Sequence, residues 1–283
     1  MKIARFEVHG EPRFGFVVDD RVIDAAAVEG VTAGSVRELI AGGVLPDLGA
    51  VTAAGPGVPI DEVRLLPPVE AGKIVCAGVN FHTHREEASL DTARPDHPTI
   101  FTRYADSVVG HGSNLLKPDR IHAFDYEGEL AVIIGSEARD ISEGEAGQHV
   151  FGYACFNDGS ARDWQQHSGQ WAPGKNFYQS GGFGPWIVTA DETGDLDDAE
   201  LVTRVNGEVR QSARIKDMVF SVAELIAYTT AFTPLSPGDV IAAGTPGGVG
   251  FFSDPQRLLE IGDVVEVEIA GLGTLRNRVQ KPT

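Results

Sequence analysis

Little positive charge, few cysteines and no long apolar run characterise this chain. Its 23 lysine and arginine residues stand against 41 acidic residues, which gives a net charge of −18 at pH 7 over 283 residues. Binding to nucleic acid needs a basic stripe that replaces the counterions of phosphates, so the composition argues against a nucleic-acid partner. No apolar stretch approaches the roughly 20 residues that a transmembrane helix needs, so we expect no membrane partner either.

Only two cysteines are present, Cys76 and Cys155, and both lie in apolar, strand-like segments. Buried free thiols in a reducing compartment explain this placement better than a disulfide does. Residues 1–8 alternate apolar and polar side chains like a strand, and they lack the apolar segment of a signal peptide. These features predict a cytoplasmic protein.

Short strand-like segments outnumber helix-like ones, so the sequence predicts a β-rich α+β fold, a roll or sandwich with a few helices. The expected strands span residues 3–8, 15–18, 21–23, 74–79, 99–102, 126–134, 151–156, 184–188, 201–205, 264–269 and 274–279. The expected helices span residues 35–40, with Ser35 as N-cap, 81–89, and 221–232, with a capping box from Ser221 to Glu224. Asn206-Gly207 is typical of a hairpin turn.

A change of composition divides the chain into two unequal parts. Residues 49–59 are rich in Gly, Ala and Pro, and Pro67-Pro68 follows shortly afterwards. We therefore expect a small N-terminal α+β domain at 1–68 and a larger, catalytic domain at 69–283. The N-terminal part carries no grouped residues that suggest chemistry.

Two glutamates two positions apart are the strongest chemical signal. Glu127 and Glu129 lead into the apolar run 130–134, and on a strand their side chains point to the same face. Like charges about 4 Å apart repel by roughly 4 kcal/mol at an effective dielectric of about 20, a penalty that a hard dication such as Mg²⁺, Mn²⁺ or Ca²⁺ removes. Asp158 is the expected third ligand, and Asp125 shares the glutamates' face. The competing interpretation is an edge strand with a solvated acidic face. The fully apolar run that follows suits a central strand better than an edge strand.

Further polar residues follow the expected metal ligands along the chain. On a helix that begins near Asn157, the side chains of Asp158, Arg162 and Gln165 would share one face. The arginine and the glutamine would then offer donors to a bound oxyanion, although a structural Asp–Arg pair explains the spacing as well. Lys175 lies among glycines that permit close approach to a ligand, whereas a lone loop lysine is commonly solvated.

An acid–base pair is expected one helical turn apart, where Glu87 would orient the imidazole of His84 as a general base. Two alternatives are an ordinary surface helix and zinc ligation by His82 and His84. The glycine-rich segment 244–250 lacks the Lys-Ser/Thr of a phosphate-binding P-loop. Its backbone N–H groups could instead cradle a carboxylate.

Together these segments resemble the fumarylacetoacetate hydrolase family, in particular its bacterial branch of acylpyruvate hydrolases and 2-oxo-heptenedioate isomerases. The resemblance runs from about Lys73 to Val279. Its main motifs are Asn80-Phe81-x-x-His84-x-x-Glu87, Asp125-Tyr126-Glu127-Gly128-Glu129, Asn157-Asp158-x-Ser160-Ala161-Arg162-Asp163, Pro237-Gly238-Asp239-Val240-Ile241 and Gly244-Thr245-Pro246-x-Gly248-Val249-Gly250.

The resemblance implies a mixed β-sandwich-roll catalytic domain behind a small N-terminal domain, in a homodimer. It implies Mg²⁺ or Mn²⁺, with Ca²⁺ as a substitute in a crystal, held by Glu127, Glu129 and Asp158. It implies catalytic roles for His84, Glu87 and Lys175, and substrate binding by Arg162, Gln165 and Thr245. In relatives the acid–base pair is carried on a lid that closes over the substrate.

The activity that the resemblance implies is hydrolysis of a carbon–carbon bond in acylpyruvate-like 1,3-diketo acids. Water activated by His84 would attack the distal carbonyl, and the metal would stabilise the enolate that leaves. The same scaffold also supports 2-oxo acid decarboxylases, isomerases and hydratases, and a non-catalytic metal- and ligand-binding member is a further alternative.

Departures from the family pattern concern the walls of the substrate pocket. Gly159 replaces a commonly larger residue, residues 176–180 differ from the usual Phe-Asp-Thr segment, and Arg103 stands where many relatives carry lysine. Arg103 could pair a distal carboxylate of the substrate or simply be solvated. These differences leave the identity of the substrate open.

Overall fold

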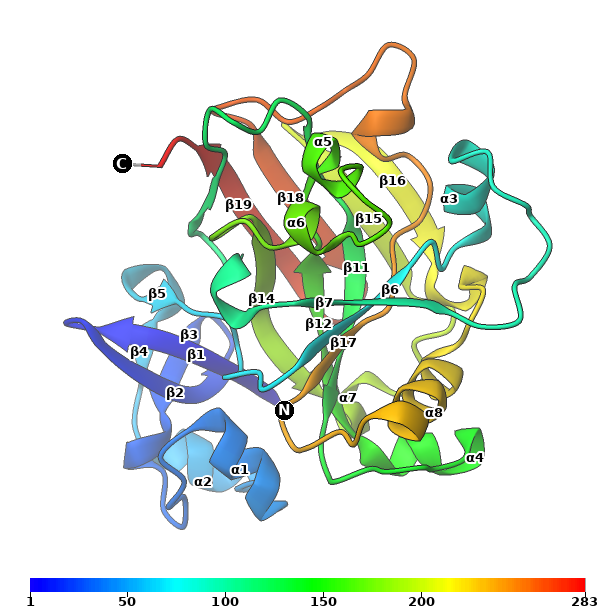
Figure 1. The fold of residues 1–283 in the computed structure, drawn as a ribbon. Coiled ribbons are helices and arrows are strands. Elements are labelled where there is room, and N and C mark those ends of the chain that lie inside the picture. Colours follow the sequence, from blue (N-terminus) through cyan, green and yellow to red (C-terminus); the bar gives the residue numbers. More distant parts are fainter. Residues whose placement is uncertain (283) are drawn as a thin grey trace.

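The computed structural model describes residues 1–282 and shows a strand-rich α+β fold, which confirms the predicted fold class (Figure 1). The main sheet runs in the order β4 (Val58–Pro59), β3 (Arg21–Asp24), β2 (Glu11–Val18), β1 (Lys2–Val8), β14 (Gly181–Thr189), β12 (Val150–Asn157), β11 (Gly128–Ile134), β17 (Val240–Ala242), β6 (Ile74–Gly78) and β7 (Thr99–Arg103), with β5 (Arg64–Leu65) beside β1 and β8 (Val108–Val109) beside β14. The second sheet runs in the order β16 (Glu208–Arg214), β15 (Glu200–Val205), β18 (Val264–Ile269), β19 (Gly273–Gln280) and β9 (Asn114–Leu116). A separate pair consists of β10 (Phe124–Asp125) and β13 (Ser160–Ala161).

The helices are short and lie around these sheets. They are α1 (Val36–Gly42), α2 (Leu48–Ala53), α3 (His82–Glu87), α4 (Glu143–Ala146), α5 (Arg162–Gln165), α6 (Ala172–Lys175), α7 (Ala190–Thr193) and α8 (Val222–Phe232). Single 3₁₀ turns are η1 (Ala25–Ala27), η2 (Ile60–Glu62), η3 (Ala105–Ser107), η4 (Gly147–His149), η5 (Ile215–Asp217) and η6 (Gly250–Phe252). Within residues 1–282, none of them combines the length and apolar character that crossing a bilayer requires.

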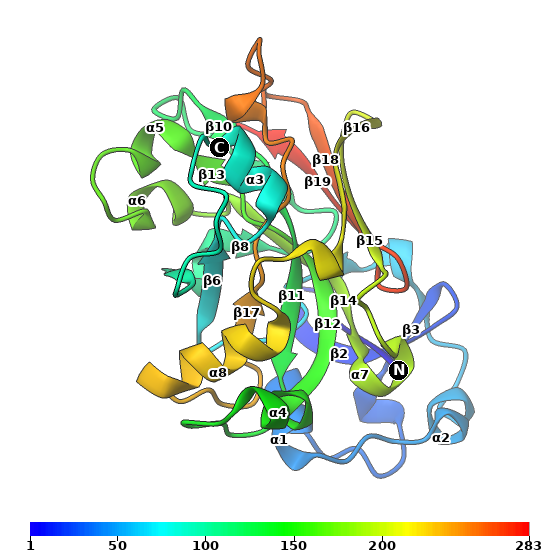
Figure 2. The same ribbon diagram turned by 90° about the vertical axis from the view of Figure 1, so that its right-hand side faces the viewer.

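The centre of the molecule is β11, which lies between β12 and β17 and is buried along its whole length. Leu130, Val132 and Ile134 pack in the core that the second sheet and α8 cover, whereas Ala131 and Ile133 pack in the core on the opposite face. Figure 2 shows the second sheet beside β11, β12 and β14. A strand buried on both faces explains the unbroken apolar run, and the edge-strand interpretation of this segment is therefore wrong.

The N-terminal strands extend the main sheet. They form the expected meander, and β1 pairs with β14 through Lys2 with Val188 and Ile3 with Ile187. Helix α1 begins after Ser35, whose side chain accepts a hydrogen bond from the backbone of Glu38 as expected for an N-cap. One sheet thus crosses the proposed domain boundary near residue 68, and that boundary stays a prediction.

Several local predictions are confirmed in the larger part of the chain. The capping box at the start of α8 forms between Ser221 and Glu224. Asn206 and Gly207 both have positive φ, 53° and 80°, as a type I′ turn between β15 and β16 requires. The two cysteines are free and buried, and burial raises the pKa of the Cys155 thiol to about 12.

The strand predicted over 126–134 begins later, at Gly128, where β11 starts. Residues 126–127 separate it from β10, which ends at Asp125. There the backbone N–H of Glu127 donates to the side-chain oxygen of Asn157 in β12 rather than to a backbone carbonyl. The helix predicted to begin near Asn157 is also wrong. Asn157 ends β12, where it is paired with Gly128 on one side and Gly182 on the other, and α5 begins only at Arg162.

Gly152 marks a position in β12 where the backbone packs too closely for a side chain. A Cβ atom there would lie 2.3 Å from the carbonyl oxygen of Val188 in β14. We expect Gly152→Ala to lower the free energy of unfolding by about 1–3 kcal/mol, as overpacking does. Gly147→Ala is the control, because its Cβ would meet nothing within 4 Å. Urea unfolding of both variants tests this, and equal stability would contradict the close packing.

Candidate active site

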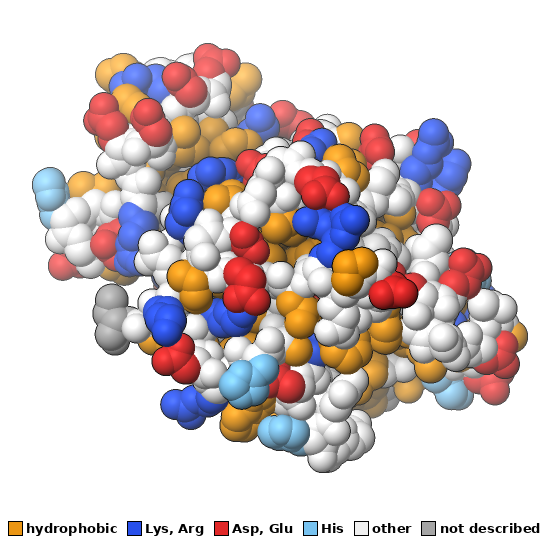
Figure 3. Space-filling model, turned by 90° about the horizontal axis from the view of Figure 1, so that it is seen from above, with side chains coloured by type: hydrophobic (Ala, Val, Ile, Leu, Met, Phe, Trp, Pro, Cys, Tyr) orange, Lys and Arg blue, Asp and Glu red, His pale blue; other side chains and the backbone are white. Residues whose placement is uncertain are grey.

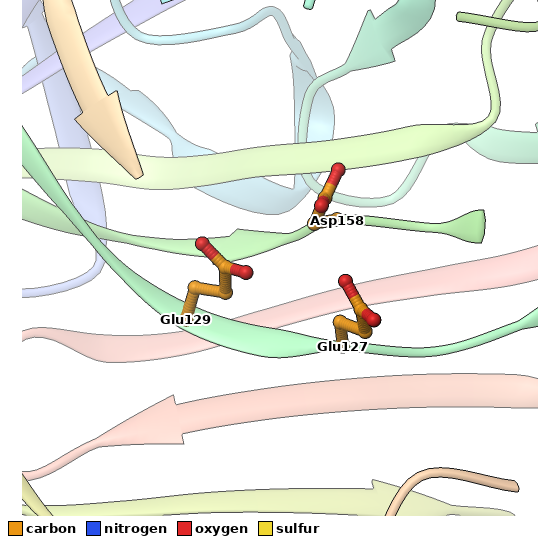
Figure 4. Close-up of side chains that lie close together, drawn as sticks. All are labelled: Glu127, Glu129 and Asp158. Carbon is orange, nitrogen blue, oxygen red and sulfur yellow. The ribbon is translucent and has the colours of Figure 1, made fainter. Parts of the chain in front are cut away.

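Antiparallel pairing of β11 with β12 brings three carboxylates together. Gly128 lies opposite Asn157 in this ladder. Glu127 and Glu129, the neighbours of Gly128, therefore lie close to Asp158, the neighbour of Asn157. Ligand oxygens of the three side chains lie within 4.8 Å of one another, and all three residues are at most 4% exposed. Figure 4 shows the carboxylates on adjoining segments, turned toward a shared space.

Two of the three carboxylates have cationic partners. Glu127 is paired with Arg162, at 2.7 Å between Nη1 and Oε1, and with Lys175. Asp158 is paired with Arg103, at 2.5 Å between Nη1 and Oδ1, and with Lys175, at 2.6 Å between Nζ and Oδ2. Burial favours the neutral acid, but the nearby Arg162 and Lys175 outweigh it and hold the pKa of Glu127 below its usual value. Glu127 is therefore kept ionised.

Glu129 differs, since no lysine or arginine of the described chain forms an ion pair with it. Its Oε2 accepts a hydrogen bond of 3.0 Å from the backbone N–H of Gly244. Burial, followed by repulsion from Asp158 and Glu127, raises the pKa of Glu129 well above its usual value. An additional positive charge near these three oxygens would remove that repulsion.

The charges of the site fit a dication. Five carboxylates gather here, and three permanent cations face them, which leaves an excess of two negative charges. The carboxylates belong to Glu87, Asp125, Glu127, Glu129 and Asp158, and the cations to Arg103, Arg162 and Lys175. Three carboxylates with no imidazole or thiolate suit Mg²⁺ or Mn²⁺. No other group of His, Cys, Asp or Glu with this geometry occurs in residues 1–282, so zinc ligation by His82 and His84 is wrong.

The expected acid–base pair forms on α3. Nδ1 of His84 lies 2.6 Å from Oε1 of Glu87, and the imidazole is 4% exposed. The other oxygen of Glu87 accepts a hydrogen bond of 2.7 Å from the backbone N–H of Gly248. Because Glu87 occupies Nδ1, Nε2 is the nitrogen of His84 that remains for a ligand.

The glycine-rich segment 244–251 holds the protein's own carboxylates. Besides Glu129 and Glu87, it binds Asp125, which accepts hydrogen bonds of 2.8 and 3.0 Å from the backbone of Gly250 and Phe251. Gly244 and Gly248 have φ of 98° and 104°, a conformation that favours glycine. One loop thus connects the carboxylate cluster with the acid–base pair.

A cavity of about 370 Å³ is lined by His84, Glu127 and Glu129 and by four further expected site residues. They are Arg162, Gln165, Lys175 and Thr245. The guanidinium of Arg162 donates to Asp125 (2.9 Å) and to Gln165 (3.1 Å). Lys175 is 2% exposed, so the interpretation of a solvated loop lysine is wrong.

The expectations for Arg103 are corrected by the structure. Its side chain is buried, does not line the cavity, and donates to Asp158, Ser107 and Ser180. Arg103 therefore holds a carboxylate of the cluster instead of meeting substrate or solvent. Helical spacing in the sequence cannot reveal such a pair, because 55 positions separate Arg103 from Asp158.

Gln211 is a site residue that the sequence did not indicate. Its Oε1 accepts a hydrogen bond from the backbone of Gly128, and its Nε2 donates to the hydroxyl of Thr245 and the carbonyl of Pro246. It thereby fixes the glycine-rich loop to β11. A single glutamine in the polar strand β16 carries no local pattern that could have revealed this role.

The two parts of the chain match two different family models. Residues 73–280 match the family model described as fumarylacetoacetate (FAA) hydrolase C-terminal, and residues 1–68 match the model described as Rv2993c-like, N-terminal. Over 233 residues the chain is 40% identical to oxaloacetate tautomerase FAHD2A, mitochondrial, of Homo sapiens, which covers 81% of this chain and 74% of that protein.

Solved structures that match over 100% of both chains include a hydrolase and an isomerase. Fumarylacetoacetate hydrolase from psychrophilic Exiguobacterium antarcticum is 36% identical with a TM-score of 0.85. The 5-carboxymethyl-2-hydroxymuconate delta-isomerase from Mycobacterium smegmatis is 31% identical with a TM-score of 0.80. The similar proteins thus include a hydrolase, an isomerase and a tautomerase.

Replacing Glu129 by glutamine tests the carboxylate cluster. We expect Glu129→Gln to weaken Mg²⁺ binding in calorimetry by at least about tenfold, since even residues that only support a metal ligand cost 10–100-fold. The thermal midpoint of the metal-free variant should be unchanged or higher, because the substitution removes a repelled charge. Glu62→Gln, at an exposed position, is the control. An unchanged Mg²⁺ titration would show that Glu129 is not a ligand.

Proposed function

Because this chain belongs to the fumarylacetoacetate hydrolase family, we propose that it is a Mg²⁺- or Mn²⁺-dependent hydrolase that cleaves a carbon–carbon bond in acylpyruvate-like 1,3-diketo acids. The observation that carries the proposal is a single cavity lined by Glu127 and Glu129 of the carboxylate cluster and by His84, the imidazole of the His84–Glu87 pair. Homodimeric assembly and a cytoplasmic location, expected from the sequence, are part of the same proposal.

Glu127, Glu129 and Asp158 would hold the metal ion. When bound, the ion would polarise the 2-oxo and carboxylate oxygens of the substrate. Lys175 and Arg162 border the same space and are held in place by the carboxylates. Their positive charges would orient the 2-oxo acid and stabilise negative charge as it develops.

His84 would act as the general base. Its Nε2 would take a proton from water while Glu87, held by the backbone of Gly248, keeps the imidazole oriented. The hydroxide oxygen adds to the distal carbonyl carbon, and the bond between that carbon and the neighbouring methylene carbon breaks. The electron pair passes to the pyruvate fragment as an enolate, which takes up a proton to give pyruvate, and the acyl group leaves as a carboxylic acid.

The second candidate is proton transfer within a 2-oxo acid, in an isomerase or tautomerase. Its support is the 40% identity to an oxaloacetate tautomerase and the likeness to an isomerase. This reaction needs the same base and the same polarised carbonyl but no attacking water. Decarboxylation or hydration on the same scaffold, and ligand binding without catalysis, are the remaining alternatives.

Metal removal separates the catalytic proposals from ligand binding without catalysis. Treatment with EDTA should abolish turnover of acetylpyruvate, and added Mg²⁺ or Mn²⁺ should restore it, because the polarising charge returns. Absorbance of the diketo acid and mass spectrometry of the products would follow the reaction, with oxaloacetate as a second compound for tautomerisation and decarboxylation. Turnover that continues unchanged in EDTA would contradict the metal-dependent mechanism.

Substitution of His84 distinguishes hydrolysis from reactions without water. His84→Ala should lower the hydrolysis rate by about 10²–10⁴-fold, the usual contribution of a general base, and lower oxaloacetate decarboxylation much less. His82→Ala is the matched control, because His82 is exposed on the same helix. Equal losses in both reactions would remove His84 as the base that activates water.

A further inference from the structure

The cavity changes from charged to apolar between its floor and its mouth. Lys175 at the floor is 2% exposed, and its ammonium lies 5.0 Å above the ring of Phe101. Phe101 in turn packs edge-on against Trp171, with ring centroids 5.4 Å apart. At the mouth, Leu90 and Phe252 are 44% and 40% exposed. Apolar side chains also reach the surface among charged ones on the end of the molecule seen in Figure 3.

The aromatic wall is built into the backbone of β6. A Cβ atom at Gly78 would lie 2.2 Å from the ring of Trp171, so the absence of a side chain lets the indole lie directly on the strand. Ala77 and Val79, on either side, line the same cavity. This wall offers a flat, largely apolar surface with no charged side chain.

The cations at the cavity are already paired. Arg162 contacts Asp125 and Glu127, and Lys175 contacts Glu127 and Asp158. Among the described residues that line the cavity there is no further lysine or arginine. The 2-oxo acid end of a substrate would meet the floor, and a second carboxylate near the mouth would find no cationic partner.

We infer that the part of the substrate remote from its 2-oxo acid group is uncharged and apolar, aliphatic or aryl, and that Leu90, Phe101 and Trp171 select it. This inference rests on the proposed function and names its substrate class. An unpaired carboxylate loses its hydration on entering an apolar wall, whereas an alkyl or aryl group gains from the same transfer. The cavity therefore distinguishes substrates by the charge of the tail.

Binding of two isosteric 2-oxo acids that cannot undergo the cleavage tests this inference. 5-Methyl-2-oxohexanoate carries two methyl groups where 2-oxopentanedioate carries two carboxylate oxygens. Calorimetry at pH 7.5 with saturating Mg²⁺ should give a dissociation constant at least about tenfold lower for the neutral-tailed acid. Pyruvate, the shared head group, is titrated in parallel.

A charge placed at the mouth should reverse the preference. Leu90→Arg should narrow the ratio of the two dissociation constants by about tenfold or invert it, because the guanidinium supplies the missing partner. Leu90→Gln, similar in size and uncharged, should keep the ratio of the native protein.

The outcomes separate the inference from the proposed function. If both acids bind and the dicarboxylate binds as tightly or more tightly, the apolar-tail inference is overturned while 2-oxo acid binding stands. If the preference exists but Leu90→Arg leaves it unchanged, the assignment to the wall is overturned. If neither acid nor pyruvate binds, the proposed function is contradicted and the inference falls with it.

Discussion

The buried negative charge around Glu129 is the constraint on which the site depends. The central strand β11 carries this carboxylate into an interior where it meets Glu127 and Asp158 but no cationic side chain of its own. Arg103, Arg162 and Lys175 neutralise part of the cluster and are themselves immobilised by it. An interior this acidic is stable only when the remaining charge is balanced or neutralised by protonation, and a dication satisfies that requirement.

Backbone N–H groups also hold the carboxylates of the site in place. The loop 244–251 donates N–H groups to Glu129, Glu87 and Asp125, so a single segment orients the carboxylate cluster, the partner of His84 and the partner of Arg162. Gln211 fastens the loop to β11. Because fixed backbone dipoles need no rearrangement during a reaction, such an arrangement is suited to catalysis.

The charged floor of the cavity and its apolar wall are separated in space. The charged floor consists of residues that match the family's motifs, and this agrees with relatives that include a hydrolase, an isomerase and a tautomerase. The wall of Trp171 and Phe101 and the exposed Leu90 lie outside those motifs. Under the proposed function, a change in this wall would alter which substrate binds while leaving the chemistry at the floor unchanged.

The sequence alone determined the strand-rich fold class and the buried central strand, because apolar periodicity is a local property. It also marked Glu127, Glu129 and Asp158 as candidate ligands by their side-chain chemistry, although only the pairing of β11 with β12 brings Asp158 to the two glutamates. It also indicated the His84–Glu87 pair, which needs only one helical turn. Tertiary structure decided that Arg103 binds Asp158, that Gln211 holds the loop, that α5 begins at Arg162 and that the strand breaks at residues 126–127. Each of these depends on contacts between segments distant in the chain, whose partners no local pattern identifies.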